Sequence, residues 1–125
     1  MEIAGKKILV TGGALRVGEA LCRGLAAAGA KIIIHCNNSR DAARQLAREI
    51  NADVICRDFS CADNAADIFQ ESGPVDVLIN NASVFECESL CDESMAHCRE
   101  QFEVNFFAPL LLLGEFYHQC SGHRC

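Results

Sequence analysis

Four short apolar runs, each followed by a segment with helical spacing, constrain the fold of this chain more than any other feature. The runs lie at residues 8–10, 31–35, 54–56 and 75–80, and most of their side chains are apolar. Apolar and polar side chains do not alternate along these runs, as they would in a strand with one face in water. Both faces of the sheet that they form are therefore expected to be covered. Strands that alternate with helices are expected to be parallel. The order therefore predicts an α/β fold, namely half of a doubly wound parallel sheet of about four strands with flanking helices.

Apolar spacing and end signals define the expected helices. The first runs from Val17 to Ala28 and stops at Gly29, and Ser39 can cap a second helix that runs to about Ile50. A third is expected at 62–71, and a long one from about Ser94 to His118, bent or started late around Pro109. We expect one domain over residues 1–118 and an irregular tail at 119–125.

Charge and composition narrow the function. Residues 1–31 carry five Lys/Arg and two Asp/Glu, a local charge of +3, whereas residues 32–125 carry six and fifteen, a local charge of −9. Most of the chain would repel phosphate backbones, so no nucleic-acid partner is expected. The longest apolar run, 106–113, is too short for a bilayer, and no membrane association is expected. The start resembles no signal peptide, which predicts a cytoplasmic location.

The nine cysteines form no Cys-x-x-Cys pair. Cys22, Cys36 and Cys56 lie in apolar segments and are interpreted as small buried hydrophobic residues. The end of the chain contains four potential zinc ligands, His118, Cys120, His123 and Cys125. Their short, alternating spacing is not typical of structural zinc, and no metal is predicted.

The first strand ends in a glycine-rich turn that leads into the first helix. This turn reads Thr11-Gly12-Gly13-Ala14-Leu15-Arg16-Val17-Gly18. Glycine allows close approach of a ligand, and the N–H groups at a helix start suit a pyrophosphate. The alternative is a tight turn without a ligand. Its position after a strand and before a helix favours nucleotide binding.

The end of the second strand bears on the choice of nucleotide. An NAD site usually carries an acid there, but this chain reads His35-Cys36-Asn37-Asn38-Ser39-Arg40, with no acid before Asp41. Asn38, Ser39 and Arg40 can hold a 2′-phosphate, and Arg16 can add charge, which favours NADP(H). The simpler alternative makes Ser39 a helix cap and Arg40 a solvated side chain, and both roles can coexist. The missing acid also argues against a methyltransferase that uses S-adenosylmethionine.

Four motifs in order resemble the short-chain dehydrogenase/reductase family over essentially the whole chain, which implies a Rossmann-like fold and its N-terminal, cofactor-binding half. They are Thr11-Gly12-x-x-x-Arg16-x-Gly18, Asp58, Asn80-Asn81-Ala82-Ser83 and Asn105. Arg16 stands where the family usually has another Gly. Arg16 in the turn and Ser83 after Asn-Asn-Ala look more like pteridine reductases and dihydrofolate-reducing relatives than like sugar or steroid dehydrogenases. The resemblance implies cofactor binding by Gly12, Arg16, Val17, Gly18, Asn81, Ala82 and Ser83, adenine contact by Asp58, and a catalytic-helix role for Asn105.

Structural roles remain open for the same residues. Asp58 could cap a helix, Asn80 and Asn81 could satisfy backbone groups at a strand end, and Asn105 could be a buried polar residue. Phe85, in the loop 84–92, could stack on a flat substrate ring, although a plain exposed loop is the simpler interpretation.

The family's Tyr-x-x-x-Lys pair is missing from these 125 residues. The single tyrosine, Tyr117, is followed four positions later by Ser121, and the lysines are Lys6, Lys7 and Lys31. The resemblance thus implies an oxidoreductase of a carbonyl or pterin-like imine, inactive as this truncated chain. The alternative is a non-catalytic dinucleotide-binding or interaction module.

A homo-oligomer is expected through the exposed fourth strand or the long helix. The helix carries an apolar face, which we predict to consist of Phe102, Phe106, Leu110, Leu113, Phe116 and Tyr117.

Overall fold

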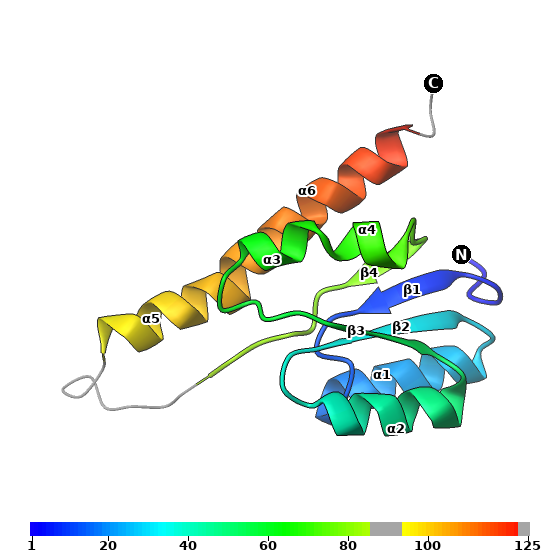
Figure 1. Ribbon diagram of the computed structural model, residues 1–125. Helices are drawn as coiled ribbons and strands as arrows, with labels where there is room; N and C mark the ends of the chain where they lie inside the picture. Colours follow the sequence, from blue (N-terminus) through cyan, green and yellow to red (C-terminus); the bar gives the residue numbers. More distant parts are fainter. Residues whose placement is uncertain (86–93, 123–125) are drawn as a thin grey trace.

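The computed structural model describes residues 1–85 and 94–122 and shows two helical layers around one sheet (Figure 1). In chain order the elements are β1 (Lys7–Val10), α1 (Arg16–Ala27), β2 (Lys31–Cys36), α2 (Arg40–Ile50), β3 (Asp53–Cys56), α3 (Asp63–Ala66), α4 (Ile68–Ser72), β4 (Val77–Ile79), α5 (Met95–Phe102), the π-helix η1 (Glu103–Phe107) and α6 (Ala108–Ser121).

The four described strands form one parallel sheet in the order β3-β2-β1-β4. The chain steps outward from β1 to β3 and then returns to the other side of β1. In the register, Ile8 lies beside Ile32 and Val77. This is half of a doubly wound sheet, as predicted, and its reversal point lies at the carboxyl ends of β1 and β4, where such sheets bind ligands.

Each face of the sheet buries its own apolar cluster, because successive side chains of a strand point to opposite faces. Ile8, Val10 and Ile34 pack with α1 and α2, whereas Leu9, Ile33 and Ile55 pack with α3, α4, η1 and α6. Figure 1 shows these two helical layers below and above the sheet. The continuous apolar strands are therefore explained by helices on both faces.

The prediction of one continuous third helix is wrong, because two short helices, α3 and α4, occupy this segment. Residues 62–71 were predicted to form one helix, but Asp67 separates α3 from α4. The Asp67 carboxylate accepts a hydrogen bond from Gln70 Nε2 at 3.2 Å, and the Asp67 carbonyl accepts the Gln70 N–H at 3.1 Å. Asp and Asn compete for backbone groups in this way, which weakens a continuous helix.

The long helix begins and is disturbed close to the expected residues. Ser94 caps it, with Oγ accepting the His97 N–H at 3.1 Å. The disturbance predicted at Pro109 is the π-helix η1, which directly precedes α6. Proline has no N–H to give to the carbonyl four residues earlier, so the regular α-helical ladder is interrupted there.

The end of the long helix and its apolar face differ from expectation in two details. Residues 119–121, expected to be irregular, are helical, and the Gln119 side chain hydrogen-bonds Val75 N and O at 3.3 and 2.8 Å. Phe116, predicted on the outer face, packs instead against the core. Tertiary contacts to Val75 therefore extend α6. Within residues 1–85 and 94–122, no helix is long and apolar enough to cross a bilayer.

Candidate functional site

Thr11, which directly follows β1, ties this strand to the loop that follows β4. Its hydroxyl oxygen accepts the N–H groups of Asn81 at 2.9 Å and Ala82 at 3.0 Å, and the side chain is 1% exposed. The Asn81 side chain returns two hydrogen bonds, from Nδ2 to the carbonyls of Thr11 and Gly12, both at 3.1 Å. Asn81 thus satisfies backbone groups at a strand end and also fixes the glycine turn.

The turn is built on two glycines in close contact. A Cβ on Gly18 would lie 2.0 Å from the Gly12 carbonyl oxygen, and a Cβ on Gly12 would lie 2.8 Å from Ala82 Cα. Gly12 also has a φ of +62°, in the region that favours glycine. Neither position has room for a side chain, so the turn can pack tightly against the loop after β4.

Arg16 begins α1 in an unusual backbone conformation. Its φ is +54°, in the left-handed region, and non-glycine residues there are strained. This is the position at which the resemblance expects glycine. The N-cap residue, Leu15, gives no side-chain hydrogen bond to the first turn. The N–H groups of that turn have no acceptor within the helix, so an anion can accept their hydrogen bonds.

An open cavity of about 250 Å³ lies at this helix start. Seven of the predicted cofactor residues line it together with Leu15: Gly12, Arg16, Val17, Gly18, Asn81, Ala82 and Ser83. They come from two segments about 65 residues apart in sequence, and the β1–β4 pairing brings them together. Backbone donors, one guanidinium and small side chains give this cavity the chemistry of an anion site.

His35 was not predicted as a site residue, yet it supports the turn. Its Nδ1 accepts the Gly12 N–H at 3.2 Å, and its Nε2 donates to the Arg57 carbonyl at 2.9 Å. The ring stacks on Phe59 at 4.0 Å and is 2% exposed. Burial lowers the pKa of His35 to about 4, so the ring is neutral. A polar residue within a buried apolar strand was the available sequence signal.

The residues predicted for a 2′-phosphate follow β2 at the same edge of the sheet. Asn38 and Arg40 are exposed, and Ser39 is half-buried. Ser39 occupies the N-cap position of α2, as predicted, but its hydroxyl makes no cap hydrogen bond. Its hydroxyl is therefore not committed to the helix. These three residues are not among those that line the cavity at Arg16.

Asp58 organises the turn after β3. Its Oδ1 accepts the Ser60 N–H at 2.9 Å and Asn37 Nδ2 at 3.3 Å. Hydrogen bonds from Ser60 hold the pKa of the Asp58 carboxyl below its ordinary value of 3.8, so it is ionised at neutral pH. The carboxylate thus joins the segments after β2 and β3 and remains largely exposed.

Asn105 holds the loop after β4 against η1. Its Oδ1 accepts the Val84 N–H at 2.8 Å, and its Nδ2 donates to the Val84 carbonyl at 2.7 Å. The side chain is exposed, which differs from the buried residue considered as an alternative. Phe85, next in the chain, is 81% exposed, and the rest of loop 84–92 lies outside the described residues.

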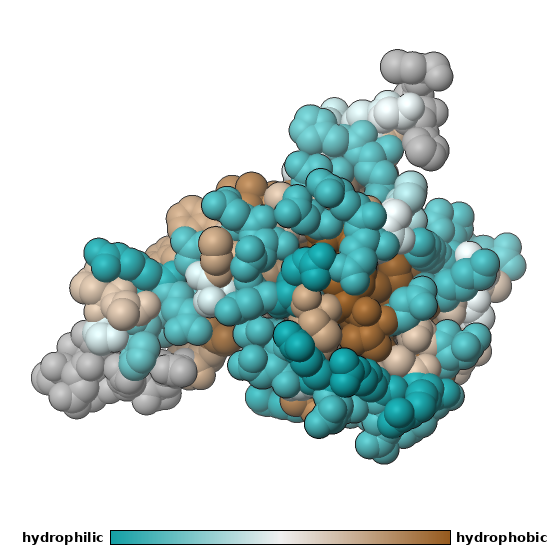
Figure 2. Space-filling view, in the orientation of Figure 1, coloured by the Kyte–Doolittle hydropathy of each residue, from teal (hydrophilic) through white to brown (hydrophobic). Residues whose placement is uncertain are grey.

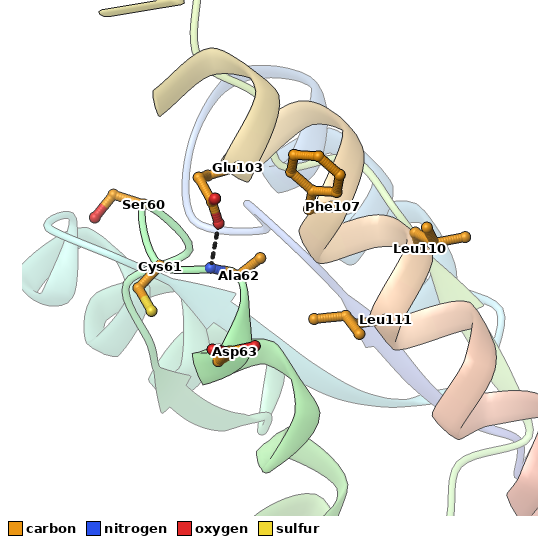
Figure 3. Close-up of a pocket in the computed structure, with 8 residues that line it drawn as sticks. All are labelled: Ser60, Cys61, Ala62, Asp63, Glu103, Phe107, Leu110 and Leu111. Carbon is orange, nitrogen blue, oxygen red and sulfur yellow. Dashed lines mark hydrogen bonds between the residues drawn. The ribbon is translucent and has the colours of Figure 1, made fainter. Parts of the chain in front are cut away.

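A larger cavity, of about 460 Å³, lies between the start of α3 and the long helix (Figure 3). In Figure 3, Leu111 points from the long helix towards Asp63, and the Glu103 carboxylate accepts the Ala62 N–H at 2.8 Å. Phe107 and Leu110 line the same cavity. Its lining includes none of the predicted site residues. The cavity belongs with the apolar surface of η1 and α6.

Tyr117 lies near the C-terminal end of α6, together with His118 and Cys120, two of the four potential zinc ligands. Tyr117 is 69% exposed, and its carbonyl accepts the Ser121 hydroxyl at 2.8 Å. In the described part of the chain, no three His, Cys, Asp or Glu side chains form a metal-ligand group. His123 and Cys125 lie outside the described residues.

A family model described as short chain dehydrogenase matches residues 6–124. The cyclic-di-GMP-binding biofilm dispersal mediator protein of Escherichia coli is 30% identical over 105 residues, which cover 84% of this chain and 44% of that protein. The 2-dehydro-3-deoxy-D-gluconate 5-dehydrogenase of Formosa agariphila is 28% identical over 120 residues, which cover 89% of this chain and 46% of that protein. The chain therefore spans a little under half the length of these curated relatives.

Solved structures with bound cofactor are also similar. FolM alternative dihydrofolate reductase 1 from Brucella canis, complexed with NADP, matches with a TM-score of 0.84 and 31% identity, over 93% of this chain and 50% of that one. A blue fluorescent protein from a metagenomic library, in complex with NADPH, matches with a TM-score of 0.88 and 28% identity, over 94% and 52%.

Proposed function

Because this chain belongs to the short chain dehydrogenase family, we propose that it is the NADP(H)-binding portion of an oxidoreductase. The observation that carries the proposal is the cavity at the start of α1. Seven residues singled out from the sequence line it, and the first turn of the helix has no side-chain cap. Two similar structures, FolM and the blue fluorescent protein, contain NADP and NADPH respectively, which supports the same cofactor here.

Each part of the dinucleotide has residues suited to it. The first-turn N–H groups of α1 would receive the pyrophosphate, since they combine free donors with the positive end of the helix dipole. Arg16, Asn38, Ser39 and Arg40 would hold the 2′-phosphate, and Asp58 would contact adenine. Asn81, Ala82 and Ser83 would form the wall on the β4 side.

We propose that the oxidoreductase reaction needs parts of the family fold beyond these 125 residues. When bound, the dinucleotide supplies or accepts a hydride. We propose that the substrate is a carbonyl or pterin-like imine, as Arg16 and Ser83 suggested. Asn105 is proposed to act in catalysis; its contacts with Val84 support a role in positioning the loop after β4.

These 125 residues contain no Tyr-x-x-x-Lys pair to transfer the proton. We therefore expect the chain alone to bind the cofactor and to reduce no substrate at an appreciable rate. A small-molecule substrate would be turned over only if the missing Tyr and Lys side chains were supplied by further residues.

Self-association is proposed through the outer face of the long helix. Phe102, Phe106, Leu110, Leu113 and Tyr117 are each more than half exposed. Figure 2 shows apolar atoms gathered over η1 and the adjoining part of α6. An apolar surface of this kind is typical of a protein interface.

The cytoplasmic location expected from the sequence stays a prediction.

Calorimetric titration with NADPH and with NADH tests the proposed cofactor. We expect NADPH to bind more tightly than NADH. Arg16→Ala and Arg40→Ala should each weaken NADPH binding by about 1–3 kcal/mol and leave NADH nearly unchanged. Arg48→Ala, two turns further along α2, is the matched control and should change neither. Equal affinities for both cofactors would remove the 2′-phosphate assignment, and no heat from a folded sample would remove the proposal itself.

A further inference from the structure

Two cysteines that are 20 positions apart in sequence face each other in the sheet. Cys36 ends β2, Cys56 ends β3, and the two are register partners in the parallel pair. Their Sγ atoms are 3.4 Å apart. Because register partners project to the same face of a sheet, the sheet itself holds the two thiols together.

The surroundings of the pair are apolar on one side and open on the other. Cys36 is 2% exposed and belongs to the cluster beneath α1 and α2. Cys56 is half-buried, at the edge strand of the sheet. One thiol is therefore reachable from solvent, and the second lies directly behind it.

We propose that Cys36 and Cys56 are a redox modification site, at which a small-molecule disulfide such as oxidised glutathione converts the two thiols into a disulfide that ties β3 to β2. The proposal rests on the position of the two sulfurs and does not require the proposed NADP(H) function.

The reaction balances in two exchange steps. The Cys56 thiolate attacks one sulfur of the small disulfide, so that a mixed disulfide forms and one small thiol leaves. The Cys36 sulfur, after losing its proton to solvent, then attacks Cys56 Sγ and releases the second small thiol. The protein pair loses two electrons and two protons, and the small disulfide gains them.

The geometry is suited to the second step. The sulfurs must move from 3.4 Å to the bond length of about 2.05 Å, and neighbouring strands hold Cα atoms within the range that disulfides span. Burial, and then the hydrogen bond and charge of Cys56, raise the pKa of Cys36 to about 12. The contribution of the Cys56 charge disappears once Cys56 is in the mixed disulfide, whereas the lowering effect of Arg40 and Arg44 remains.

The bond would lie directly ahead of the turns proposed to hold the adenosine end of the cofactor. The Arg57 N–H donates to the Cys36 carbonyl at 3.0 Å, and Asn37 Nδ2 donates to Asp58 at 3.3 Å. Fixing the edge strand at this point should raise the thermal unfolding midpoint of the oxidised chain above that of the reduced chain.

Peptide mapping tests the proposal on the whole chain. The folded protein is titrated with oxidised glutathione, alkylated with iodoacetamide and digested with trypsin without reduction. Tryptic cleavage gives peptides 32–40 and 49–57, each with one cysteine, so the Cys36–Cys56 link is identified without ambiguity. We expect this linked pair to be the main intramolecular disulfide, to disappear on reduction, and to be absent in Cys56→Ser.

Two controls keep the result interpretable. Cys61→Ser removes an exposed thiol from the turn after β3 and should leave the link intact. In urea, where the sheet no longer holds the sulfurs together, the preference for Cys36–Cys56 should be lost. An unlinked, alkylated Cys36 in a folded sample whose Cys61 or Cys120 is already modified by glutathione would overturn the proposal, as would the same preference in urea.

Discussion

His35 Nδ1 accepts a hydrogen bond from the Gly12 N–H at 3.2 Å, so a side chain near the end of β2 fixes the turn that follows β1. Its Nε2 donates to the Arg57 carbonyl at 2.9 Å, which adds the end of β3 to the same connection. One neutral ring thereby joins three neighbouring strand ends directly beside the proposed phosphate site.

This ring should make stability depend on pH. Its pKa is about 4 in the folded chain, against an ordinary value of 6.5. Below pH 6.5 the unfolded chain takes up a proton that the folded chain refuses, so stability falls until about pH 4. We expect a loss of about 2 kcal/mol between pH 7 and pH 5, measured by urea unfolding. His35→Gln, which cannot titrate, should be less stable at pH 7 but should lose much less on acidification. An equal pH dependence in both proteins would show that His35 is not responsible.

Gly18 and Gly24 offer a matched pair of substitutions in α1. Gly18→Ala places a Cβ 2.0 Å from the Gly12 carbonyl oxygen and should cost about 2 kcal/mol of folding free energy or more. A Cβ on Gly24 meets nothing within 4 Å, so Gly24→Ala should add about 0.5–1 kcal/mol through helix propensity. Thermal and urea unfolding measure both. Similar effects of the two changes would contradict the close contact between Gly18 and Gly12.

Arg16 should show opposite effects on stability and on cofactor binding. Arg16→Gly removes the strain of a φ of +54° and should stabilise the folded chain by up to about 1 kcal/mol. The same change should weaken NADPH binding, because the guanidinium is lost. Arg16→Ala keeps the strain and loses the charge, so it should weaken binding without the gain in stability. The strain argument fails if Arg16→Gly is no more stable than Arg16→Ala.

Asn105 should act on stability through Val84 alone. Asn105→Ala removes hydrogen bonds to both Val84 N and O and is expected to cost about 1 kcal/mol, the modest value of exposed hydrogen bonds. Asn105→Asp keeps the acceptor for the Val84 N–H but cannot donate to the Val84 carbonyl. Its stability should therefore lie between that of the wild type and that of Asn105→Ala. Urea unfolding ranks the wild type and the two variants by their free energy of unfolding. An Asn105→Asp variant as stable as the wild type would show that the hydrogen bond to the Val84 carbonyl does not contribute to stability.

The outer face of α6 should control self-association. Leu113 is 53% exposed, and Leu113→Glu places a charge in the proposed interface. We expect the apparent mass in size-exclusion chromatography and light scattering to fall towards that of a single chain. Glu115→Gln, on the same helix, is the control and should leave the mass unchanged. A wild-type chain that remains monomeric at high concentration would exclude this interface.

The local sequence determined the elements and most of the candidate site. Continuous apolar runs separated by helical spacing were sufficient for the parallel sheet, because burial on both faces imposes that pattern on each strand. The glycine turn was recognisable because its glycines, Arg16 and the helix that follows are adjacent in the chain. Asn81, Ala82 and Ser83 were found by resemblance, and the pairing of β1 with β4 placed them in the same cavity.

Only the tertiary structure decided which distant groups touch. The bond from Gly12 to His35, the pairing of Asn105 with Val84 and the contact between Cys36 and Cys56 join residues about 20 positions apart, and no local pattern encodes such pairs. The break at Asp67 and the extension of α6 through Gln119 depend on side chains that choose between helix and tertiary partners. Secondary structure follows from near-neighbour spacing, whereas these contacts depend on strand order and register, which are fixed when the whole sheet packs between its helices.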